Sequence, residues 1–225
     1  MTDLATRYLG LALRNPLVAS ASPLSQTVEG VRALADAGVG AVVLPSLFEE
    51  QVRQEQLRDL QVTEPYDESF GEALSYFPSR AGSPGGGAHY LHLVERAVGV
   101  AGDLGVPVVA SLNGSSPGGW ARFAASLQDA GAAAIELNVY LVPGDPHLSG
   151  RDVEDWHVEI LRTVREVVSV PVAVKLSPHF SSVGQMALRL DDAGAAGLVL
   201  FNPVPAARHR PRDDLRAPPP VPVGA

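Results

Sequence analysis

Short apolar runs recur along the chain, and longer stretches of mixed apolar and polar residues separate them. The runs are almost continuously apolar, which is typical of strands in a parallel sheet that helices cover. The stretches between them favour helices where their apolar residues return every three or four positions. We therefore expect strands near residues 16–20, 40–44, 107–111, 133–138, 171–176 and 197–201.

A repeated phrase marks the ends of these units. Asp-Ala-Gly stands at residues 36–38, 129–131 and 192–194, each time just before an apolar run. Glycine often closes a helix, because it readily adopts the left-handed conformation that follows the last turn. The copies are spaced at near multiples of about 31 residues, which is the size of one strand–helix unit. The sequence therefore predicts a series of β/α units.

The clearest helix is expected at residues 151–168. Apolar residues return there at helical spacing, at Val153, Trp156, Ile160, Val164 and Val167. Ser149 precedes this stretch and Asp152 follows three positions later, which resembles a capping signal at a helix start. The pattern predicts an amphipathic helix that packs on the sheet.

Two segments do not follow this alternation. Residues 45–88 form a long excursion after the second expected strand, and long connections of this kind are often functional or mobile loops. Residues 203–225 hold seven of the 19 prolines and have neither helical nor strand periodicity. We expect an extended tail there.

The number of units leaves two architectures open. An open doubly wound sheet suits the chain length, because a closed (β/α)8 barrel typically takes about 250 residues. The first expected strand is not followed by a Gly-x-Gly-x-x-Gly turn, however, and this disfavours a dinucleotide-binding sheet.

The composition excludes several kinds of function. The 225 residues carry 17 basic and 25 acidic side chains, a formal net charge of −8, and no cysteine. This charge balance disfavours binding to nucleic acids or to anionic membranes. Disulfides and cysteine nucleophiles are excluded. No apolar run reaches the roughly 18 residues of a membrane-spanning helix, so we expect a soluble, cytoplasmic protein.

One basic residue differs from all the others. Lys175 is the only lysine, and it lies near the end of an expected strand. Active sites in parallel α/β proteins lie at the carboxyl ends of the strands. An ammonium is a compact charge that arginine does not replace. We interpret Lys175 as a functional residue rather than a solvated strand end.

Three asparagines also follow apolar runs, namely Asn113, Asn138 and Asn202. A carboxamide both donates and accepts hydrogen bonds, as the recognition of a heteroaromatic ring requires. Asparagine is equally common in turns, so one such residue alone indicates little. Three at one end of a sheet would form a polar rim.

Two further patterns are weaker. The glycine-rich stretch 113–120 leads from a strand into a helix, where backbone N–H groups can bind an anion or a ring. His89, His92 and Glu95 resemble metal ligands. Helical spacing places Glu95 far around the helix from His89, so an ordinary amphipathic helix is the better interpretation, and we predict no metal site.

Three segments resemble the dihydroorotate dehydrogenase family. They are Asn15 to Pro23, Glu136-Leu137-Asn138, and Val172 to Pro178, and the resemblance extends from about residue 5 to Asn202. Members of this family are FMN-binding (β/α)8 barrels that oxidise dihydroorotate to orotate in pyrimidine biosynthesis. The resemblance implies an α/β fold of the TIM (β/α)8 barrel type, incomplete, with about six βα units. It also implies FMN, a dihydroorotate-like substrate and, as an assembly, a homodimer.

The resemblance gives roles to individual residues. Lys175 would lie against the flavin ring, where a cation stabilises the reduced, anionic flavin. Asn138 and Asn202 would bind the substrate. The other cofactor contacts it implies are Ser46, Asn113 and the backbone of Ser20, Ala21 and Ser22.

Two positions depart from the family pattern. Leu141 stands where the family carries its general base, a cysteine or a serine, and a leucine side chain cannot accept a proton. Pro45 stands where the family has a lysine after the second strand. We therefore name no catalytic base and expect impaired activity.

The resemblance stops at Asn202, whereas the family strands that bind the FMN phosphate follow that point. We divide the chain into a partial flavin-binding barrel domain, residues 1–202, and a tail, residues 203–225, which resembles an out-of-frame translation. We expect weak or absent flavin binding by these residues alone. Two alternatives remain, a non-catalytic fragment or pseudoenzyme, and a Schiff-base lyase or aldolase that uses Lys175 as nucleophile.

Overall fold

A curled parallel sheet is the centre of the fold. The computed structural model describes residues 2–48, 87–113, 117–139, 145 and 147–202. Its 6-stranded sheet has the order β3-β4-β5-β6-β7-β8, with every neighbouring pair parallel. The strands are β3 (Val18–Ala19), β4 (Ala41–Phe48), β5 (Val108–Asn113), β6 (Ala134–Asn138), β7 (Val172–Leu176) and β8 (Gly197–Leu200).

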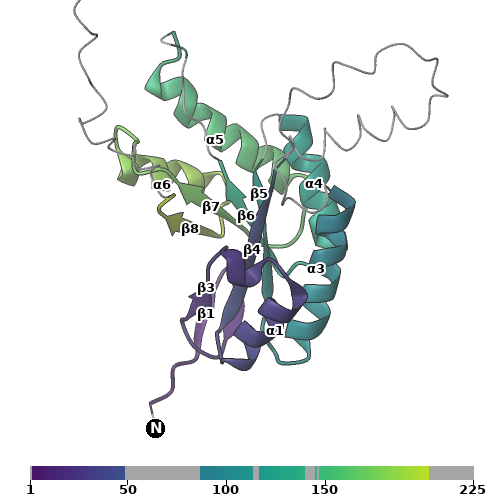
Figure 1. Ribbon diagram of the computed structural model, residues 1–225. Coiled ribbons are helices and arrows are strands. Elements are labelled where there is room, and N and C mark those ends of the chain that lie inside the picture. Colours follow the sequence, from purple (N-terminus) through teal and green to yellow (C-terminus); the bar gives the residue numbers. More distant parts are fainter. Residues whose placement is uncertain (1, 49–86, 114–116, 140–144, 146, 203–225) are drawn as a thin grey trace, which may run out of the picture.

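The helices lie on one side of this sheet, and together they form a half-barrel (Figure 1). The helices are α1 (Val28–Asp36), α3 (Gly87–Gly102), α4 (Pro117–Asp129), α5 (Gly150–Arg165) and α6 (Val183–Asp192). A doubly wound sheet would change its strand order at a switch point and carry helices on both faces. The described residues do neither, so the incomplete barrel is confirmed and the doubly wound alternative is wrong.

Most of the expected elements are present. Each expected strand overlaps an observed one, and α5 begins where the capping signal predicts. The Ser149 side chain accepts a hydrogen bond from the Asp152 backbone N–H, while the Asp152 side chain accepts one from the Ser149 N–H. The glycines of the three Asp-Ala-Gly phrases, Gly38, Gly131 and Gly194, have φ angles of 94°, 90° and 94°. These are left-handed helix ends, as the phrase predicts.

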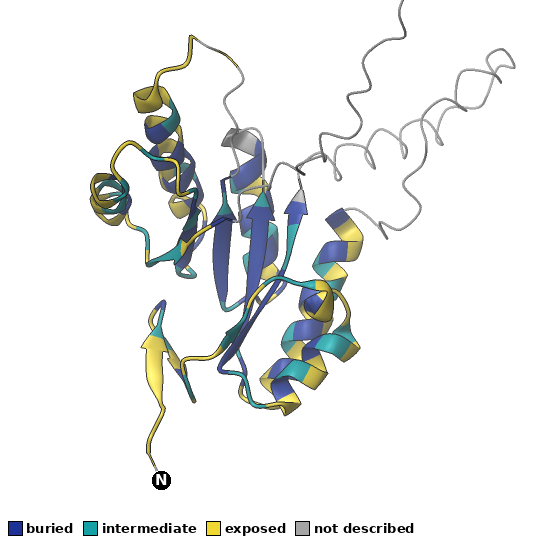
Figure 2. Ribbon diagram, turned by 60° about the vertical axis from the view of Figure 1, so that its left-hand side comes forward, coloured by how far each residue is buried: buried dark blue, intermediate teal, exposed yellow. Residues whose placement is uncertain are grey.

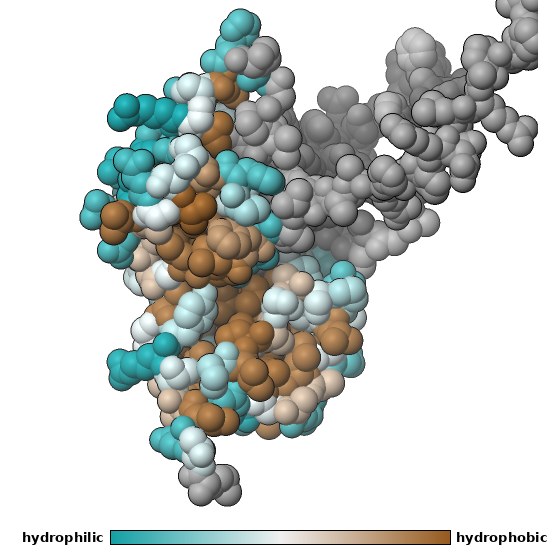
Figure 3. All heavy atoms as spheres, turned by 90° about the vertical axis from the view of Figure 1, so that its left-hand side faces the viewer, coloured by the Kyte–Doolittle hydropathy of each residue, from teal (hydrophilic) through white to brown (hydrophobic). Residues whose placement is uncertain are grey.

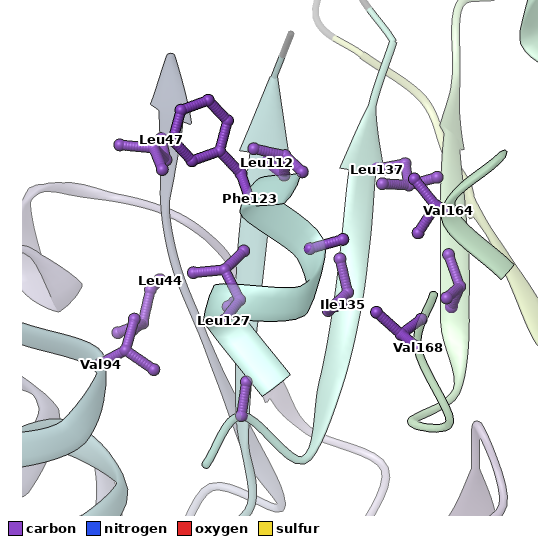
Figure 4. Packing of buried hydrophobic residues seen from close by; sticks show 14 of the residues in the cluster. Leu44, Leu47, Val94, Leu112, Phe123, Leu127, Ile135, Leu137, Val164 and Val168 are labelled. Carbon is purple, nitrogen blue, oxygen red and sulfur yellow. The ribbon is translucent and has the colours of Figure 1, made fainter. Parts of the chain in front are cut away.

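The outer face of the sheet carries the main hydrophobic core. Alternate residues of each strand point towards the helices, for example Leu112 on β5 and both Ile135 and Leu137 on β6. Phe123 and Leu127 of α4 pack over these side chains (Figure 4). The buried residues therefore form a band between the sheet and its helices (Figure 2). This layer fixes the strands whose opposite face forms the site.

A β-bulge changes the direction of side chains on β4. Val43 pairs with Val109 and Ser46 pairs with Ser111, so β4 has one more residue than β5 between the two pairs. Pro45 lies in this irregular step, where proline is tolerated because it has no N–H to donate to the ladder. The extra residue turns Ser46 to the same inner face as Val43. The expected strand end at residue 44 is wrong, because β4 continues to Phe48.

A β-hairpin that the sequence analysis did not predict covers one end of the inner face. It consists of β1 (Thr6–Tyr8) and β2 (Leu11–Leu13), joined by Leu9 and Gly10 with φ angles of 54° and 77°. Leu9 is buried against Val43, Val109, Ala134 and Ala173. A Cβ atom on Gly197 of β8 would lie 2.5 Å from the Leu9 side chain, so a larger residue there would require that side chain to move.

Two expectations fall outside the described residues. They are the structure of most of the long excursion, residues 49–86, and that of the tail, residues 203–225. Within the described parts of the chain, no helix combines the length and the apolar character that crossing a lipid bilayer requires.

Candidate functional site

Polar side chains gather on the inner face, near the carboxyl ends of β4 to β7. The register places Ser46 beside Ser111, Ser111 beside Glu136, and Asn138 beside Lys175. Paired residues in a parallel sheet point to the same face. The alternation that turns apolar residues towards the outer helices therefore turns these polar residues towards the inner face, at one edge of the half-barrel. Ser46, Asn138 and Lys175, proposed separately from the sequence, are neighbours.

Hydrogen bonds hold part of this edge in place. The Ser46 and Ser111 hydroxyl oxygens are 2.7 Å apart, and Asn138 Nδ2 donates to Ser46 Oγ at 3.4 Å. From α3, the Tyr90 hydroxyl donates to the Pro45 carbonyl at 2.6 Å and accepts from the Ser111 N–H at 3.4 Å. Burial raises the pKa of Tyr90 far above its ordinary value, so the phenol stays protonated. Hydrogen bonds to Tyr90 of α3 therefore hold the bulge that turns Ser46 to the inner face.

Lys175 is paired with a buried carboxylate. Lys175 Nζ lies 3.6 Å from Glu136 Oε1, and the two side chains are 17% and 7% exposed. Burial raises the pKa of Glu136, and the neighbouring Lys175 ammonium opposes that rise. Both groups sit above the apolar inner cluster of Val43, Val109 and Ala173.

Two polar atoms at the ends of β6 and β8 are buried and have no hydrogen-bond partner among the described residues. They are Asn138 Oδ1 and Asn202 Nδ2. The Asn202 backbone N–H donates to the Leu176 carbonyl at 2.7 Å, which places Asn202 beside the end of β7. An acceptor, a donor and an ammonium therefore occur at the ends of three adjacent strand segments. Because buried polar groups in proteins are nearly always hydrogen-bonded, these atoms are suited to a ligand that supplies both kinds of partner.

A cavity of about 410 Å³ lies on the inner face between the sheet and the hairpin. Its walls include Tyr8, Val43, Val109 and Val199, and Glu136 contributes a carboxylate. Figure 3 looks onto the side of the molecule that carries β1, β3 and β8, where apolar side chains gather. The cavity lining is therefore largely apolar, as in most small-molecule sites, and its charged residues Arg7 and Glu136 come from the hairpin and from the sheet.

The other predicted site residues lie around this edge. Ser20 is exposed and lines the cavity, Ala21 packs on the inner apolar cluster, and the Ser22 N–H donates to Ser25 Oγ at 3.2 Å. Asn113 ends β5 and pairs with Phe48. Leu141 and residues 114–116 of the glycine-rich stretch lie outside the described residues.

The pattern His89, His92 and Glu95 lies on α3, as expected of an amphipathic helix. His92 Nδ1 and Glu95 Oε2 are 3.6 Å apart, and both side chains are exposed. No group of three or more histidine, aspartate or glutamate side chains within the described residues is arranged to hold a metal ion.

Sequence reasoning missed three members of the site. Glu136 was noticed only as part of a motif, although a carboxylate inside the apolar run 132–137 is itself a signal, because such a charge needs a partner. Ser111 is a small polar residue in a buried strand. Tyr90 lies on a helix, and its contact with Pro45 follows only from the tertiary structure.

The fold is a βα half-barrel, and polar side chains gather at the carboxyl ends of its strands β4 to β7. No protein-family model matches the chain. The catalytic subunit of dihydroorotate dehydrogenase B (NAD(+)) from Methanocella arvoryzae is 29% identical over 203 residues, which cover 88% of this chain and 61% of that protein. The corresponding subunit from Endomicrobium trichonymphae is 28% identical over 209 residues, 91% of this chain and 63% of its own length.

The chain is a divergent relative of the dihydroorotate dehydrogenases, as its motifs predict. It spans a little over three fifths of the length of the two relatives described. Among solved structures, 2,3-dimethylmalate lyase, a member of the PEP mutase/isocitrate lyase superfamily, matches with a TM-score of 0.50 at 14% identity. The match covers 81% of this chain and 58% of the lyase. This likeness concerns the fold alone.

Proposed function

We propose that this chain is the ring-binding part of an FMN-dependent oxidoreductase of the dihydroorotate dehydrogenase type. The observation that carries the proposal is the Lys175 ammonium together with Asn138 Oδ1 and Asn202 Nδ2, which have no hydrogen-bond partner among the described residues. The imide edge of an isoalloxazine ring, like that of a dihydropyrimidine, offers N–H donors and carbonyl acceptors side by side. The donor set of the site therefore fits such a ring.

Lys175, Asn138 and Asn202 would each make a different contact with the ligand. Lys175 would hold negative charge on the ligand, because an ammonium in a partly buried site is weakly screened. Asn138 would accept a hydrogen bond through Oδ1, since its Nδ2 already donates to Ser46. Asn202 would donate through Nδ2. Bound FMN would supply the hydride acceptor for the oxidation of dihydroorotate to orotate.

Chemistry also gives a reason to expect slow turnover. Oxidation of dihydroorotate removes a proton as well as a hydride, and the proton needs an acceptor. Leu141, at the sequence position of the family base, cannot supply one. We therefore propose that the chain binds the flavin ring weakly, in line with the expected loss of the FMN phosphate contacts, and that turnover is impaired. The pseudoenzyme alternative makes the same binding prediction and differs only in having no turnover.

Ring binding can be measured directly. Riboflavin has the same ring as FMN without the phosphate, so titration with riboflavin reports the contacts of Lys175, Asn138 and Asn202 alone. We expect a saturable change in the visible flavin bands. The double substitution Glu136→Gln with Lys175→Met removes the ammonium without leaving a buried charge, and it should weaken binding about tenfold.

A second ion pair provides the control. Glu154→Gln with Arg189→Met removes the pair between α5 and α6, where Arg189 Nη1 lies 3.1 Å from Glu154 Oε2. This variant should bind riboflavin like the unmodified protein. The proposal fails if riboflavin causes no spectral change, or if both double variants lose affinity to the same extent.

A further inference from the structure

A buried carboxylate on β6 has no role in the motifs that suggested the function. Glu136 is 5% exposed and lies in the middle of β6, between the apolar residues Ala134 and Ile135 on one side and Leu137 on the other. Placing a charge there is costly unless it is paired. Its partner is Lys175, the only lysine of the chain.

The register shows how the pair is built. In the pairing of β6 with β7, Glu136 lies opposite Ala173 and Asn138 lies opposite Lys175. The backbone of Lys175 is therefore one inner-face position nearer the carboxyl ends of the strands than that of Glu136. Its Nζ nevertheless lies 3.6 Å from Glu136 Oε1, which means that the side chain reaches sideways to the carboxylate. The carboxylate thus determines where the ammonium sits within the rim.

Few other ionisable groups among the described residues face this ion pair. The inner apolar cluster lies beneath it, and the ionisable groups that face Glu136 are Lys175 on β7, Tyr8 on β1 and Tyr90 on α3. Arg7 shares the cavity lining but is exposed. Burial raises the pKa of both tyrosines, and the negative charge of Glu136 adds to the rise, so the described neighbours of the pair are neutral phenols.

Stability does not explain such a pair. An apolar pair of similar volume is often as stable as a buried ion pair or more so, because desolvation offsets the attraction. What the carboxylate does provide is a fixed position for the lysine, because the ion pair holds Nζ 3.6 Å from Glu136 Oε1. We propose that Glu136 is the positioning residue of the site, which holds the Lys175 ammonium in place within the rim. The purpose of this positioning rests on the proposed function, but the experiment that tests it does not depend on that function.

The test uses the ligand-free protein and the fact that the chain has one lysine. Acetic anhydride reacts with the uncharged amine, and mass spectrometry of the peptide that contains Lys175 separates its acetylation from that of the N-terminus. Glu136→Gln keeps the shape and removes the ion pair that holds the amine, and should raise the acetylation rate of Lys175 at pH 8 about tenfold. Glu136→Asp keeps the charge and should stay within about threefold of the unmodified protein.

The control is the other buried carboxylate that forms an ion pair. Glu154→Gln, in the helical layer, should leave the acetylation rate unchanged. The role of Glu136 is wrong if the Gln variant reacts at the unmodified rate, or if Glu154→Gln accelerates acetylation equally. Because no flavin is present, failure here is distinct from failure to bind riboflavin.

Discussion

Replacing Lys175 with methionine should lower the free energy of unfolding by about 3 kcal/mol at pH 8, because it leaves the Glu136 carboxylate buried without its cation. The loss should be smaller at pH 5. Burial raises the pKa of Glu136 above the ordinary value of 4.5, and removing Lys175 deletes an interaction that lowers it. The folded state of the variant therefore binds the proton more tightly than the unfolded state does.

The direction of the pH dependence follows from this linkage. A carboxyl whose pKa is raised in the folded state favours folding at low pH, and stability is lost as the pH rises through the folded-state pKa. Urea denaturation at pH 5 and pH 8 measures the difference. The double variant Glu136→Gln with Lys175→Met has no buried charge and should lie within about 1 kcal/mol of the unmodified protein at both values. Equal losses at both pH values for the single variant would show that its folded state binds no additional proton at Glu136, and would contradict a raised pKa for this carboxyl.

A second large effect is expected in the outer core. Leu137 is fully buried on β6, between Glu136 and Asn138, and points to the helices. Leu137→Ala should cost about 3 kcal/mol of stability, because it removes buried methyl groups and leaves a cavity. The matched control is Leu188→Ala on α6, whose side chain is 67% exposed and should change stability by no more than about 0.5 kcal/mol.

Urea denaturation of the two alanine variants measures both values. Similar midpoints for Leu137→Ala and Leu188→Ala would contradict the assignment of Leu137 to the main core. The result also bears on the site, since the strand that this leucine anchors carries both the positioning carboxylate and the asparagine of the rim.

The βα units were predictable because the central strands β5, β6 and β7 are mostly buried, whereas the choice of a barrel over an open doubly wound sheet came from the family resemblance. Nearly continuous apolar runs and the Asp-Ala-Gly helix ends mark each βα unit without help from tertiary contacts. The capping residues Ser149 and Asp152 fixed the start of α5 in the same way, through a local hydrogen-bond pattern. These features depend on neighbours in sequence, which a single chain reveals.

The hairpin and the bulge were not predictable by the same means. The two hairpin strands are only three residues each, and their turn is Leu9-Gly10 rather than the Asn-Gly that usually signals one. In the sequence, Pro45 indicates the end of a strand. In the structure, the hydrogen bond from Tyr90 to the Pro45 carbonyl and the pairing with β5 allow β4 to continue beyond it. Both features are decided by contacts between residues far apart in the chain.

The site was predictable only in part for a similar reason. Lys175 and the asparagines could be named from their strand-end positions. The link from Lys175 to Glu136 requires the register of β6 against β7, and the link from Asn138 to Ser46 requires the bulge. A sequence pattern gives the strand on which a residue lies, but not which residue lies opposite.

The central claim is that the Lys175 ammonium lies against a bound flavin ring, and protection of Lys175 from acetylation tests it most directly. The rate is measured with and without riboflavin at a concentration that saturates the visible spectral change. A bound ring should cover the amine and lower the acetylation rate of Lys175 at least about fivefold, while the N-terminus reacts as before. An unchanged Lys175 rate in the presence of spectroscopically bound riboflavin would place the ring elsewhere and contradict the account.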